Sequence, residues 1–414
     1  MEILKSEQYI NEKLNIQPVT KERMKNLMSN QTIMDDDVKL FIEQWSMKFN
    51  PSTQRYDCEY NITVPHELVR DDRKGFKLMF GMVKGFDCRG LGLLSLYGSP
   101  TKAFGNFDCS DNELENLNFA PTQVMGDFDC SKNKLKTLKG APQKVNLDFK
   151  CNNNNLTTLE HAPTVVNKDF RCYENTLVSL KGAPQEIKGD FSCTNNKLKT
   201  LEHAPQKVGG IFNCDQNELV SLKGAPTEVG SAFICTNNRL TSLRFSPQTV
   251  GWYFDCRYND LRTLEGVTPT LEGEFNCSVN RMLKTLKHAP VMNGGGFICI
   301  SCGLESLEGV CSEIHGDFKC SKNNLKTLRF APQKVYGEFD CSENQLESLK
   351  GSPEYVEKTF NCERNKLKTL DGAPQKVDGA FHCEHNELVS DKLPTVVGDK
   401  VYSDFNKGEA IDLG

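Results

Sequence analysis

Residues 211–219 read Ile211-Phe212-Asn213-Cys214-Asp215-Gln216-Asn217-Glu218-Leu219, or x-F-x-C-x-x-N-x-L, and this pattern recurs along most of the 414-residue chain. Its cysteine returns every 21 residues, except that one residue is inserted near Met282, between Cys277 and Cys299. A fixed period of about twenty residues predicts a solenoid of stacked coils rather than a globular enzyme fold. The fifteen marking cysteines are Cys88, Cys109, Cys130, Cys151, Cys172, Cys193, Cys214, Cys235, Cys256, Cys277, Cys299, Cys320, Cys341, Cys362 and Cys383.

Each coil is expected to bury one side of a short strand. Alternation along the strand puts Phe212 and Cys214 on the buried face and the residues between and after them on the outward face. The amide of Asn217 can bond the open backbone groups of neighbouring coils. Pro226 should prevent strand pairing on the return side, which is therefore predicted to be extended or a tight turn.

This order of residues is that of a leucine-rich repeat, with Phe and Cys at two of the leucine positions. It also resembles the leucine-rich-repeat proteins of tailed bacteriophages, in the stretch Phe128-Asp129-Cys130-Ser131-Lys132-Asn133-Lys134-Leu135 and then Gly140-Ala141-Pro142. The resemblance covers residues 54 to 406. It implies a mainly β leucine-rich-repeat solenoid with fifteen regular 21-residue coils, and it implies a phage source.

Composition argues against several function classes. The formal net charge of −5 and the pI near 5.9 give no basic surface for nucleic acid. No apolar run approaches the roughly 20 residues of a membrane helix, and the first six residues lack the apolar stretch of a secretion signal. We therefore expect a cytoplasmic protein, in the host bacterium if the source is a phage, that binds neither nucleic acid nor membrane.

Cysteine is abundant, but the repeat accounts for most of it. Fifteen of the eighteen cysteines mark coils, which leaves Cys58, Cys302 and Cys311. A column of small apolar side chains is how free cysteine behaves when it is buried, and cytosolic conditions keep thiols reduced. We therefore expect buried, reduced thiols rather than a disulfide framework.

The N-terminal segment, residues 1–50, carries no repeat. Helices are predicted for Ile3 to Leu14, Lys21 to Ser29 and Asp35 to Lys48, the last with an acidic first turn and apolar residues at helical spacing. This segment is expected to form a helical cap over the open edge of the first coil. A separate docking module is the alternative.

Three further segments follow. Residues 51–86 are interpreted as divergent first coils, with Tyr56-x-Cys58 in the F-x-C position. Residues 87–390 form the regular solenoid. Residues 391–414 are predicted to be a degenerate C-terminal capping coil, because the cysteine and leucine positions are lost there.

A period of 42 residues, which is two coils, lies inside the period of 21. Two residues before the proline position of the repeat, glycine alternates with a bulky residue. We interpret the bulky residue as a ring that lies over the bare backbone of the neighbouring coil, so its histidines are expected to pack rather than to catalyse. The glycines are Gly98, Gly140, Gly182, Gly224, Gly266, Gly309 and Gly351, and the bulky residues are Phe119, His161, His203, Phe245, His288 and Phe330.

No motif predicts catalytic, cofactor or metal chemistry. Cys299-x-x-Cys302 is interpreted as structural, because Cys302 replaces the turn asparagine of its coil. In His382-Cys383-Glu384-His385 the cysteine should point inward while the first histidine and the glutamate point outward, so these residues are not expected to converge on a metal. Gly294-Gly295-Gly296 lacks the Lys-Ser/Thr of a phosphate loop. We therefore expect no catalytic residue, no metal ion and no cofactor.

The repeat leaves the outward face of the strands free to vary, at the positions three before, one before and one after each core cysteine. In the first half this face is acidic, and stacked aspartates repel unless they are solvated or meet a cationic partner. In the middle coils it is apolar and aromatic with one arginine, as in a binding hot spot. The predicted partner-binding residues are Asp127, Asp148, Asp169, Asp190, Ile211, Ile234, Trp252, Tyr253, Arg257, Tyr258, Ile298 and Ile300.

Ile211, Ile234 and Tyr253 lie on successive coils and are expected to form one continuous outward stripe of about 10 Å. Chance substitutions that pack on one another, or cover by the N-terminal segment, are the alternatives to binding. The sequence therefore favours a non-catalytic protein-protein interaction scaffold. Its phage-like repeat suggests a host protein as the partner, such as a defence protein, and a structural component of a virion or phage-built assembly is the second hypothesis.

Overall fold

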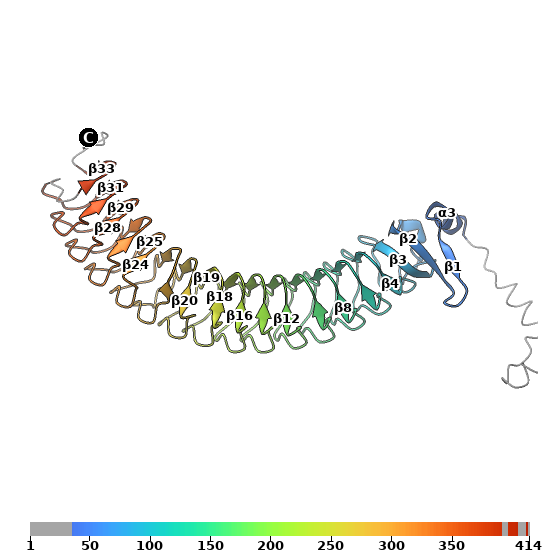
Figure 1. The fold of residues 1–414 in the computed structure, drawn as a ribbon. Helices are drawn as coiled ribbons and strands as arrows, with labels where there is room; N and C mark the ends of the chain where they lie inside the picture. Colours follow the sequence, from blue (N-terminus) through green and yellow to red (C-terminus); the bar gives the residue numbers. More distant parts are fainter. Residues whose placement is uncertain (1–34, 391–395, 405–410, 413–414) are drawn as a thin grey trace, which may run out of the picture. The chain divides into compact units, whose positions relative to one another are not determined.

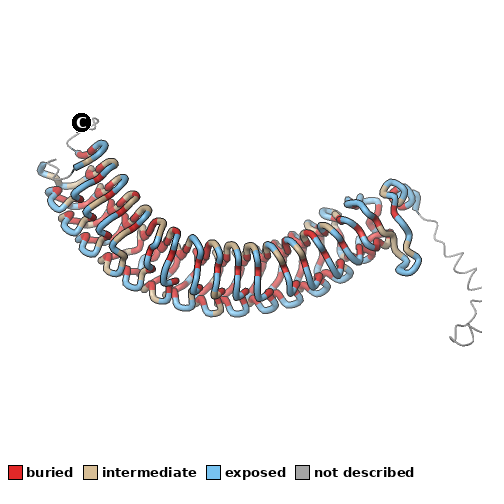
Figure 2. Tube along the Cα trace, in the orientation of Figure 1, coloured by how far each residue is buried: buried red, intermediate tan, exposed pale blue. Residues whose placement is uncertain are grey.

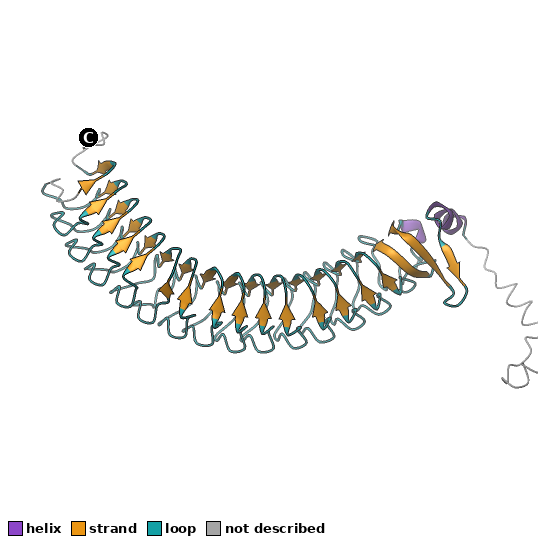
Figure 3. Ribbon diagram, viewed as in Figure 1, coloured by secondary structure: helices purple, strands orange, loops and turns teal. Residues whose placement is uncertain are grey.

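The computed structural model describes residues 35–390, 396–404 and 411–412. The chain divides into two units, Met1–Lys48 and Phe49–Gly414. The second unit contains all fifteen repeats, whose coils stack side by side in one row (Figure 1). Its strands are joined by turns and loops with almost no helix (Figure 3). The chain therefore forms a mainly β, leucine-rich-repeat-like solenoid, as the period predicts.

The first unit contains one described helix, α3 (Asp36–Gln44). Asp35 caps it, because its carboxylate accepts a hydrogen bond from the backbone N–H of Asp37 at 3.2 Å. Val38 and Phe41 are its buried residues. The third predicted helix is thus present with shorter bounds, while the other two lie outside the described residues. The roles of residues 1–50 as a cap or as a docking module stay predictions.

A continuous ladder of parallel strands runs through the F-x-C positions. Neighbouring coils pair phenylalanine with phenylalanine, as Phe191 does with Phe212. The one-residue insertion does not shift this register, because Phe275 pairs with Phe297 across it. The strands are β5 (Phe107–Asp108), β7 (Phe128–Asp129), β9 (Phe149–Lys150), β11 (Phe170–Arg171), β13 (Phe191–Ser192), β15 (Phe212–Asn213), β17 (Ala232–Ile234), β19 (Tyr253–Asp255), β21 (Phe275–Asn276), β23 (Phe297–Ile298), β25 (Phe318–Lys319), β27 (Phe339–Asp340), β29 (Phe360–Asn361) and β31 (Phe381–His382).

A second parallel ladder lies on the return side, where the sequence predicted no strand pairing. Pro226 does not prevent it, because pairing begins two residues later, at Glu228. The expectation from proline is therefore wrong for this side of the coil. The strands are β4 (Lys102–Ala103), β6 (Gln123–Val124), β8 (Lys144–Val145), β10 (Val165–Val166), β12 (Glu186–Ile187), β14 (Lys207–Val208), β16 (Glu228–Val229), β18 (Thr249–Val250), β20 (Thr270–Leu271), β22 (Val291–Met292), β24 (Glu313–Ile314), β26 (Lys334–Val335), β28 (Tyr355–Val356), β30 (Lys376–Val377) and β32 (Val396–Val397).

The first coils of the solenoid use longer strands and a different register from the one expected. Ile62 lies opposite Phe86 in a parallel pair, and Ile62 and Val64 are both buried. Ile62-x-Val64 therefore occupies the F-x-C position, and the assignment of Tyr56-x-Cys58 to it is wrong. The elements before the regular coils are β1 (Lys48–Asn50), β2 (Arg55–Thr63), the 3-10 helix η1 (His66–Leu68) and β3 (Phe80–Asp87).

The last described coil ends in β33 (Lys400–Tyr402), which pairs in parallel with β31, Val401 opposite Phe381. A final strand, β34 (Ile411–Asp412), pairs antiparallel with β33. Val401 stands where the regular coils carry phenylalanine, and the capping role of residues 391–414 stays a prediction.

The core is built from the phenylalanine, cysteine and leucine columns, and buried and exposed residues alternate along every coil (Figure 2). The phenylalanine rings of successive coils contact one another and are stacked in most pairs, as Phe191 and Phe212 are with centroids 5.4 Å apart. All eighteen cysteines are free and seventeen are buried, as predicted. The Cys214 thiol lies 3.3 Å from the Ile234 carbonyl oxygen, to which it can donate. Burial raises the pKa of the Cys214 thiol, so it stays protonated.

The turn asparagine joins each coil to the one before it. The Asn154 amide donates to the carbonyl oxygens of Cys130 at 3.1 Å and Cys151 at 3.2 Å, and its Oδ1 accepts the Leu135 N–H at 2.9 Å. The same contacts recur in thirteen of the fifteen regular coils, from Asn112 to Asn386. The coil of Cys88 carries Leu91 at this position, and the other exception is the coil of Cys299. There Cys302 replaces the asparagine, and its thiol lies 3.1 Å from the Cys277 carbonyl oxygen. The structural interpretation of Cys302 thus fits the contacts it makes.

The alternation of glycine and bulky residues marks coils that associate in pairs. Leu201, in the coil of His203, donates its N–H to the Lys223 carbonyl in the coil of Gly224 at 2.9 Å, and Glu202 forms an ion pair with Lys223 at 2.7 Å. Equivalent N–H to carbonyl bonds occur at Leu117, Leu159 and Leu243.

The interpretation that a ring covers each glycine is wrong. A Cβ placed on Gly224, where φ is +86°, would lie 2.5 Å from the Cα of Glu202, so backbone rather than a ring fills the space. The bulky residues are exposed, Phe245 by 61%. The histidines at this position are exposed as well, so they do not pack as expected.

Asn154→Ala should destabilise the protein by about 3 kcal/mol, because two cysteine carbonyls and the Leu135 N–H lose a buried partner. Chemical denaturation followed by circular dichroism measures this. Asn155 is exposed, so Asn155→Ala is the matched control and should change stability by less than about 0.5 kcal/mol. Equal effects of the two substitutions would contradict the role assigned to the turn asparagine.

Gly224→Ala should already destabilise by about 2 kcal/mol, since the added Cβ meets backbone and the left-handed φ disfavours it. Gly224→Phe should cost at least as much. His203→Phe should be nearly neutral, because Phe245 takes the equivalent place with φ +70°. A tolerated Gly224→Ala in the same denaturation assay would show that the coil pairs are not held by close backbone approach.

Candidate protein-binding face

Three rows of side chains point outward from the F-x-C ladder. We call them the leading row, three residues before each core cysteine, the middle row, one residue before it, and the trailing row, one residue after it. Parallel pairing in register aligns each row from coil to coil, as Ala232 aligns with Tyr253 and Ile234 with Asp255. Phenylalanine and cysteine fill the inward positions, so the three rows hold the residues free to vary.

The acidic part of the leading row is a hydrogen-bond ladder along the solenoid. Asp148, Asp169, Asp190 and Ile211 each donate their backbone N–H to the carboxylate of the preceding aspartate, at 3.1, 3.3, 3.0 and 2.7 Å. A Cβ on Gly210 would lie 2.1 Å from the Asp190 Oδ1, so glycine makes room for the carboxylate. The aspartates therefore connect each coil to the next, a role that differs from the partner binding predicted for them.

Cations within the chain balance part of this acidic row. The Asp148 carboxylate lies 3.5 Å from Lys168 and 3.8 Å from Arg171, and Arg171 also pairs with Asp169 at 2.9 Å. Asp148 is only 5% exposed. Its carboxylate thus offers little surface to a partner.

The ladder of acceptors ends where the middle coils begin. Ile211, Ala232 and Tyr253 occupy the leading row on three successive coils, and none of them has an acceptor that can reach the next N–H as the aspartates do. The Tyr253 N–H bonds the Ser231 carbonyl instead, at 3.4 Å. Ile211 and Tyr253 are half-buried and Ala232 is buried.

The apolar residues form a patch across two rows rather than one stripe. Ile234 lies in the middle row, opposite Asn213 and Asp255, so it sits beside the row of Ile211 and Tyr253. Ile298, further along the middle row, is buried and only 9% exposed. Ile300 in the trailing row is half-buried. The expected continuous stripe of Ile211, Ile234 and Tyr253 is therefore wrong in register, although the three side chains lie on the same face.

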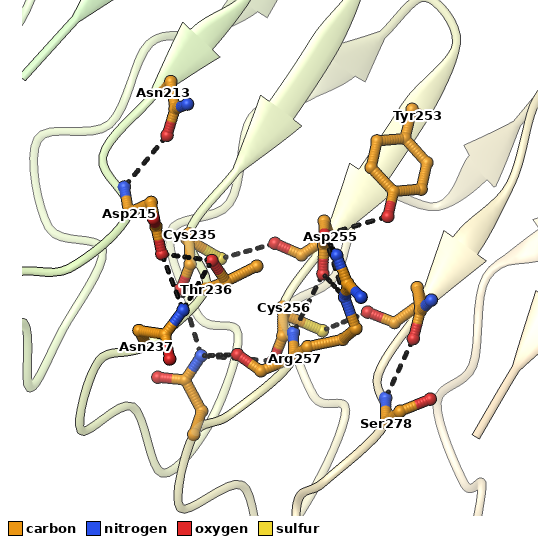
Figure 4. A network of polar contacts seen from close by, with 12 residues as sticks. Asn213, Asp215, Cys235, Thr236, Asn237, Tyr253, Asp255, Cys256, Arg257 and Ser278 are labelled. Carbon is orange, nitrogen blue, oxygen red and sulfur yellow. Dashed lines mark hydrogen bonds and ion pairs between the residues drawn. The ribbon is translucent and has the colours of Figure 1, made fainter. Parts of the chain in front are cut away.

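A buried carboxylate fixes the polar part of this patch (Figure 4). Asp255 is 2% exposed and accepts hydrogen bonds from the Tyr253 hydroxyl at 2.8 Å and from Arg257 Nε and a terminal nitrogen at 3.0 and 2.8 Å. The bond to Asp255 raises the pKa of Arg257. Burial, together with this carboxylate, raises the pKa of Tyr253. Both donors therefore keep their protons, and the arginine and tyrosine are held in place.

Beside this network, Asp215 accepts hydrogen bonds from the side chains of Thr236 and Asn237, the latter at 2.9 Å (Figure 4).

The large aromatic residues lie at the borders of the face. Trp252 is 63% exposed and Tyr258 is 51% exposed. Exposed aromatic residues and arginine are typical of protein-binding surfaces.

The structure changes the interpretation of one motif. His382 and Glu384 do point to the same face, and Glu363 from the preceding coil joins them. As expected, Cys383 is buried and does not join them, and Glu363 completes the cluster in place of Cys383 and His385. The sequence signal that could have found it is an acidic residue 21 positions before Glu384.

Within the described residues, no helix is long and apolar enough to cross a membrane.

Comparison with known proteins identifies the fold. Over 80% of this chain and 73% of the other, it is similar to the structure of YopM from Yersinia enterocolitica, with 20% identity and a TM-score of 0.50. It also aligns with the functional domain of InlJ from Listeria monocytogenes, described as including a cysteine ladder, with 17% identity, 72% and 73% coverage and a TM-score of 0.39. No protein-family model and no curated protein sequence matches the chain.

If the aspartate ladder is structural, Asp190→Ala should destabilise by about 1–2 kcal/mol, because the Ile211 N–H loses its acceptor. Asp190→Asn should cost less than half of that, since an amide oxygen plays this part at Asn106, which accepts the Asp127 N–H at 2.9 Å. Denaturation at low and high salt distinguishes a loss of the hydrogen bond from a loss of the carboxylate charge. A loss that is equal for both variants and that shrinks at high salt would assign the effect to charge.

Proposed function

We propose that this solenoid is a non-catalytic scaffold that binds a protein partner through the face formed by Ile211, Ile234, Tyr253 and Arg257. Trp252, Tyr258 and Ile300 border or extend this face. The buried Asp148 and Ile298 act within the fold, and the half-buried aspartates of the remaining acidic row, Asp127, Asp169 and Asp190, flank the face.

The observation that carries this proposal is the loss of acceptors in the middle coils. Asp190 and the aspartates before it bond the next coil through the leading row, but Ile211 cannot. In the middle row Asn213 Oδ1 accepts the Asp215 N–H at 3.0 Å and Asp255 Oδ1 accepts the Arg257 N–H at 3.1 Å, yet Ile234 between them cannot. Apolar residues thus stand where polar ones would stabilise the fold, and partner binding explains their presence.

The chemistry of the face supports a protein as the partner. Isoleucine and tyrosine offer apolar surface that gains free energy when a partner covers it. Arg257 is held by Asp255 in one orientation, so little side-chain entropy is lost when it binds. Trp252 and Tyr258 add aromatic area at the border.

The partner and its location are inferred from the phage-like repeat. We infer that the partner is a host protein in the cytoplasm of the infected bacterium, and that it belongs to the class of defence proteins. If the protein is instead recovered at a fixed copy number in purified phage particles, it is a structural component of the virion.

The double variant Ile211→Asn with Ile234→Asn tests the face without disturbing the fold. Asn106 and Asn213 already occupy these two rows, so the new amides can make bonds that the chain uses elsewhere. The partner is captured from an infected-cell lysate on the immobilised chain, identified by mass spectrometry and purified. We expect its Kd to rise at least about 30-fold, while the melting temperature changes by less than about 2 °C.

Val178→Asn with Val220→Asn is the matched control. Both valines are exposed, by 60% and 56%, and both lie outside the three outward rows. The control variant should bind like the unmodified chain. Unchanged binding by the isoleucine variant, with loss of binding by the valine variant, would place the interaction on another surface.

A further inference from the structure

A cluster of one histidine and two glutamates lies at the C-terminal end of the F-x-C ladder. His382 is in the middle row, and Glu363 and Glu384 follow one another in the trailing row on adjacent coils. His382 Nδ1 lies 3.7 Å from Glu363 Oε1 and 3.5 Å from Glu384 Oε2. One donor atom from each residue lies within 4.8 Å of the others.

The cluster is held in place on both sides. The His382 ring stacks on Tyr402 of the last coil, with centroids 4.3 Å apart and planes 7° apart. This stacking fixes the imidazole, whose Nδ1 faces the two carboxylates. On the other side, the backbone N–H of Glu363 donates to Asn361 Oδ1 at 3.0 Å, and Asn361 pairs with His382 in the strand register. The three donors therefore converge without any rearrangement of the backbone.

In the described residues, no lysine or arginine balances the negative charge of the two carboxylates in this cluster. Glu384 Oε2 is shielded from solvent and has no hydrogen-bond partner, one of two such buried side-chain atoms in the described part of the chain. In the described residues neither Glu363 nor Glu384 forms an ion pair with lysine or arginine, whereas Glu338, on the same outward face, pairs with Lys319 at 2.7 Å.

We propose that Glu363, His382 and Glu384 bind a divalent transition-metal ion, with zinc as the best fit. One imidazole nitrogen and two carboxylate oxygens are a ligand set that suits zinc and leaves a position for water. Calcium prefers six or more oxygen ligands, which this cluster does not provide. The ion links the coils of Glu363 and Glu384 at the end of the solenoid, where the stack has few further neighbours, and it satisfies the buried Oε2.

The first test is a zinc titration of the full-length chain, which has been treated with a chelator beforehand. Isothermal titration calorimetry measures the binding. We expect one saturable site, a higher melting temperature with zinc, and no comparable effect of calcium. Glu363→Gln and Glu384→Gln, which keep the shape of each side chain, should each weaken zinc binding at least about tenfold. They should also remove the zinc-dependent rise in melting temperature.

Two controls separate this cluster from other ligands. Glu338→Gln alters a glutamate of the same face that Lys319 already neutralises, and His315→Asn removes an exposed histidine that stacks on Tyr336. Both variants should bind zinc like the unmodified chain. Cobalt bound at the cluster should lack the near-ultraviolet band of a thiolate complex, because Cys362 and Cys383 point into the core.

The proposal is overturned if zinc does not saturate a site at micromolar concentration, since the stacking of His382 on Tyr402 and the contacts within the cluster then account for the geometry. It is also overturned if either glutamine variant, once shown to be folded, binds zinc as tightly as the unmodified chain, or if cobalt shows a thiolate band. Circular dichroism of each variant checks that it is folded. Because the two glutamine substitutions are independent, one folded variant suffices for the comparison.

Discussion

The turn asparagine, which thirteen of the fifteen regular coils carry, makes the interaction on which the other features of this solenoid depend. Strands of two or three residues contribute few ladder bonds, so successive coils need another connection. One side chain, such as Asn154, provides it by joining two cysteine carbonyls and a leucine N–H from adjacent coils. This contact requires each asparagine to reach the coil before it, which fixes the spacing. The one inserted residue is tolerated near Met282, which is 51% exposed, next to the coil where Cys302 replaces asparagine.

The columns of the repeat could be predicted from the sequence because each is repeated many times. Alternation in F-x-C correctly placed phenylalanine and cysteine inside, and the fixed period correctly predicted the solenoid. Contacts between coils could not be predicted in the same way, since they depend on backbone separation. The closeness of Gly224 to Glu202 and the bond from the Ile211 N–H to the Asp190 carboxylate are both invisible in a single coil. The convergence of Glu363 with His382 has the same origin, because these residues meet only after the coils are stacked.

The outward rows serve different purposes along the chain. In the early coils, aspartates in the leading row bond the next coil and so maintain the stack. In the middle coils these bonds are absent, and the rows present isoleucine, tyrosine and a fixed arginine. Near the end they carry the histidine and glutamate cluster. A solenoid permits this division because each coil contacts only its neighbours, so a change in one region leaves the packing of the others intact.

The pairing of coils bears on how a chain of this kind can grow. From Gly98 to Phe330 the position alternates between glycine and a bulky residue, so a duplication of 42 residues always preserves the alternation. The series then departs from it, because Gly351 is followed by Gly372, where a Cβ would lie 2.7 Å from the Lys350 nitrogen. Glycine thus fits after either kind of coil, whereas from Gly98 to Gly372 no bulky residue follows another. A single added coil therefore keeps this rule only if it carries glycine at this position. Chains that descend from one another by such additions should differ in length mostly by two coils.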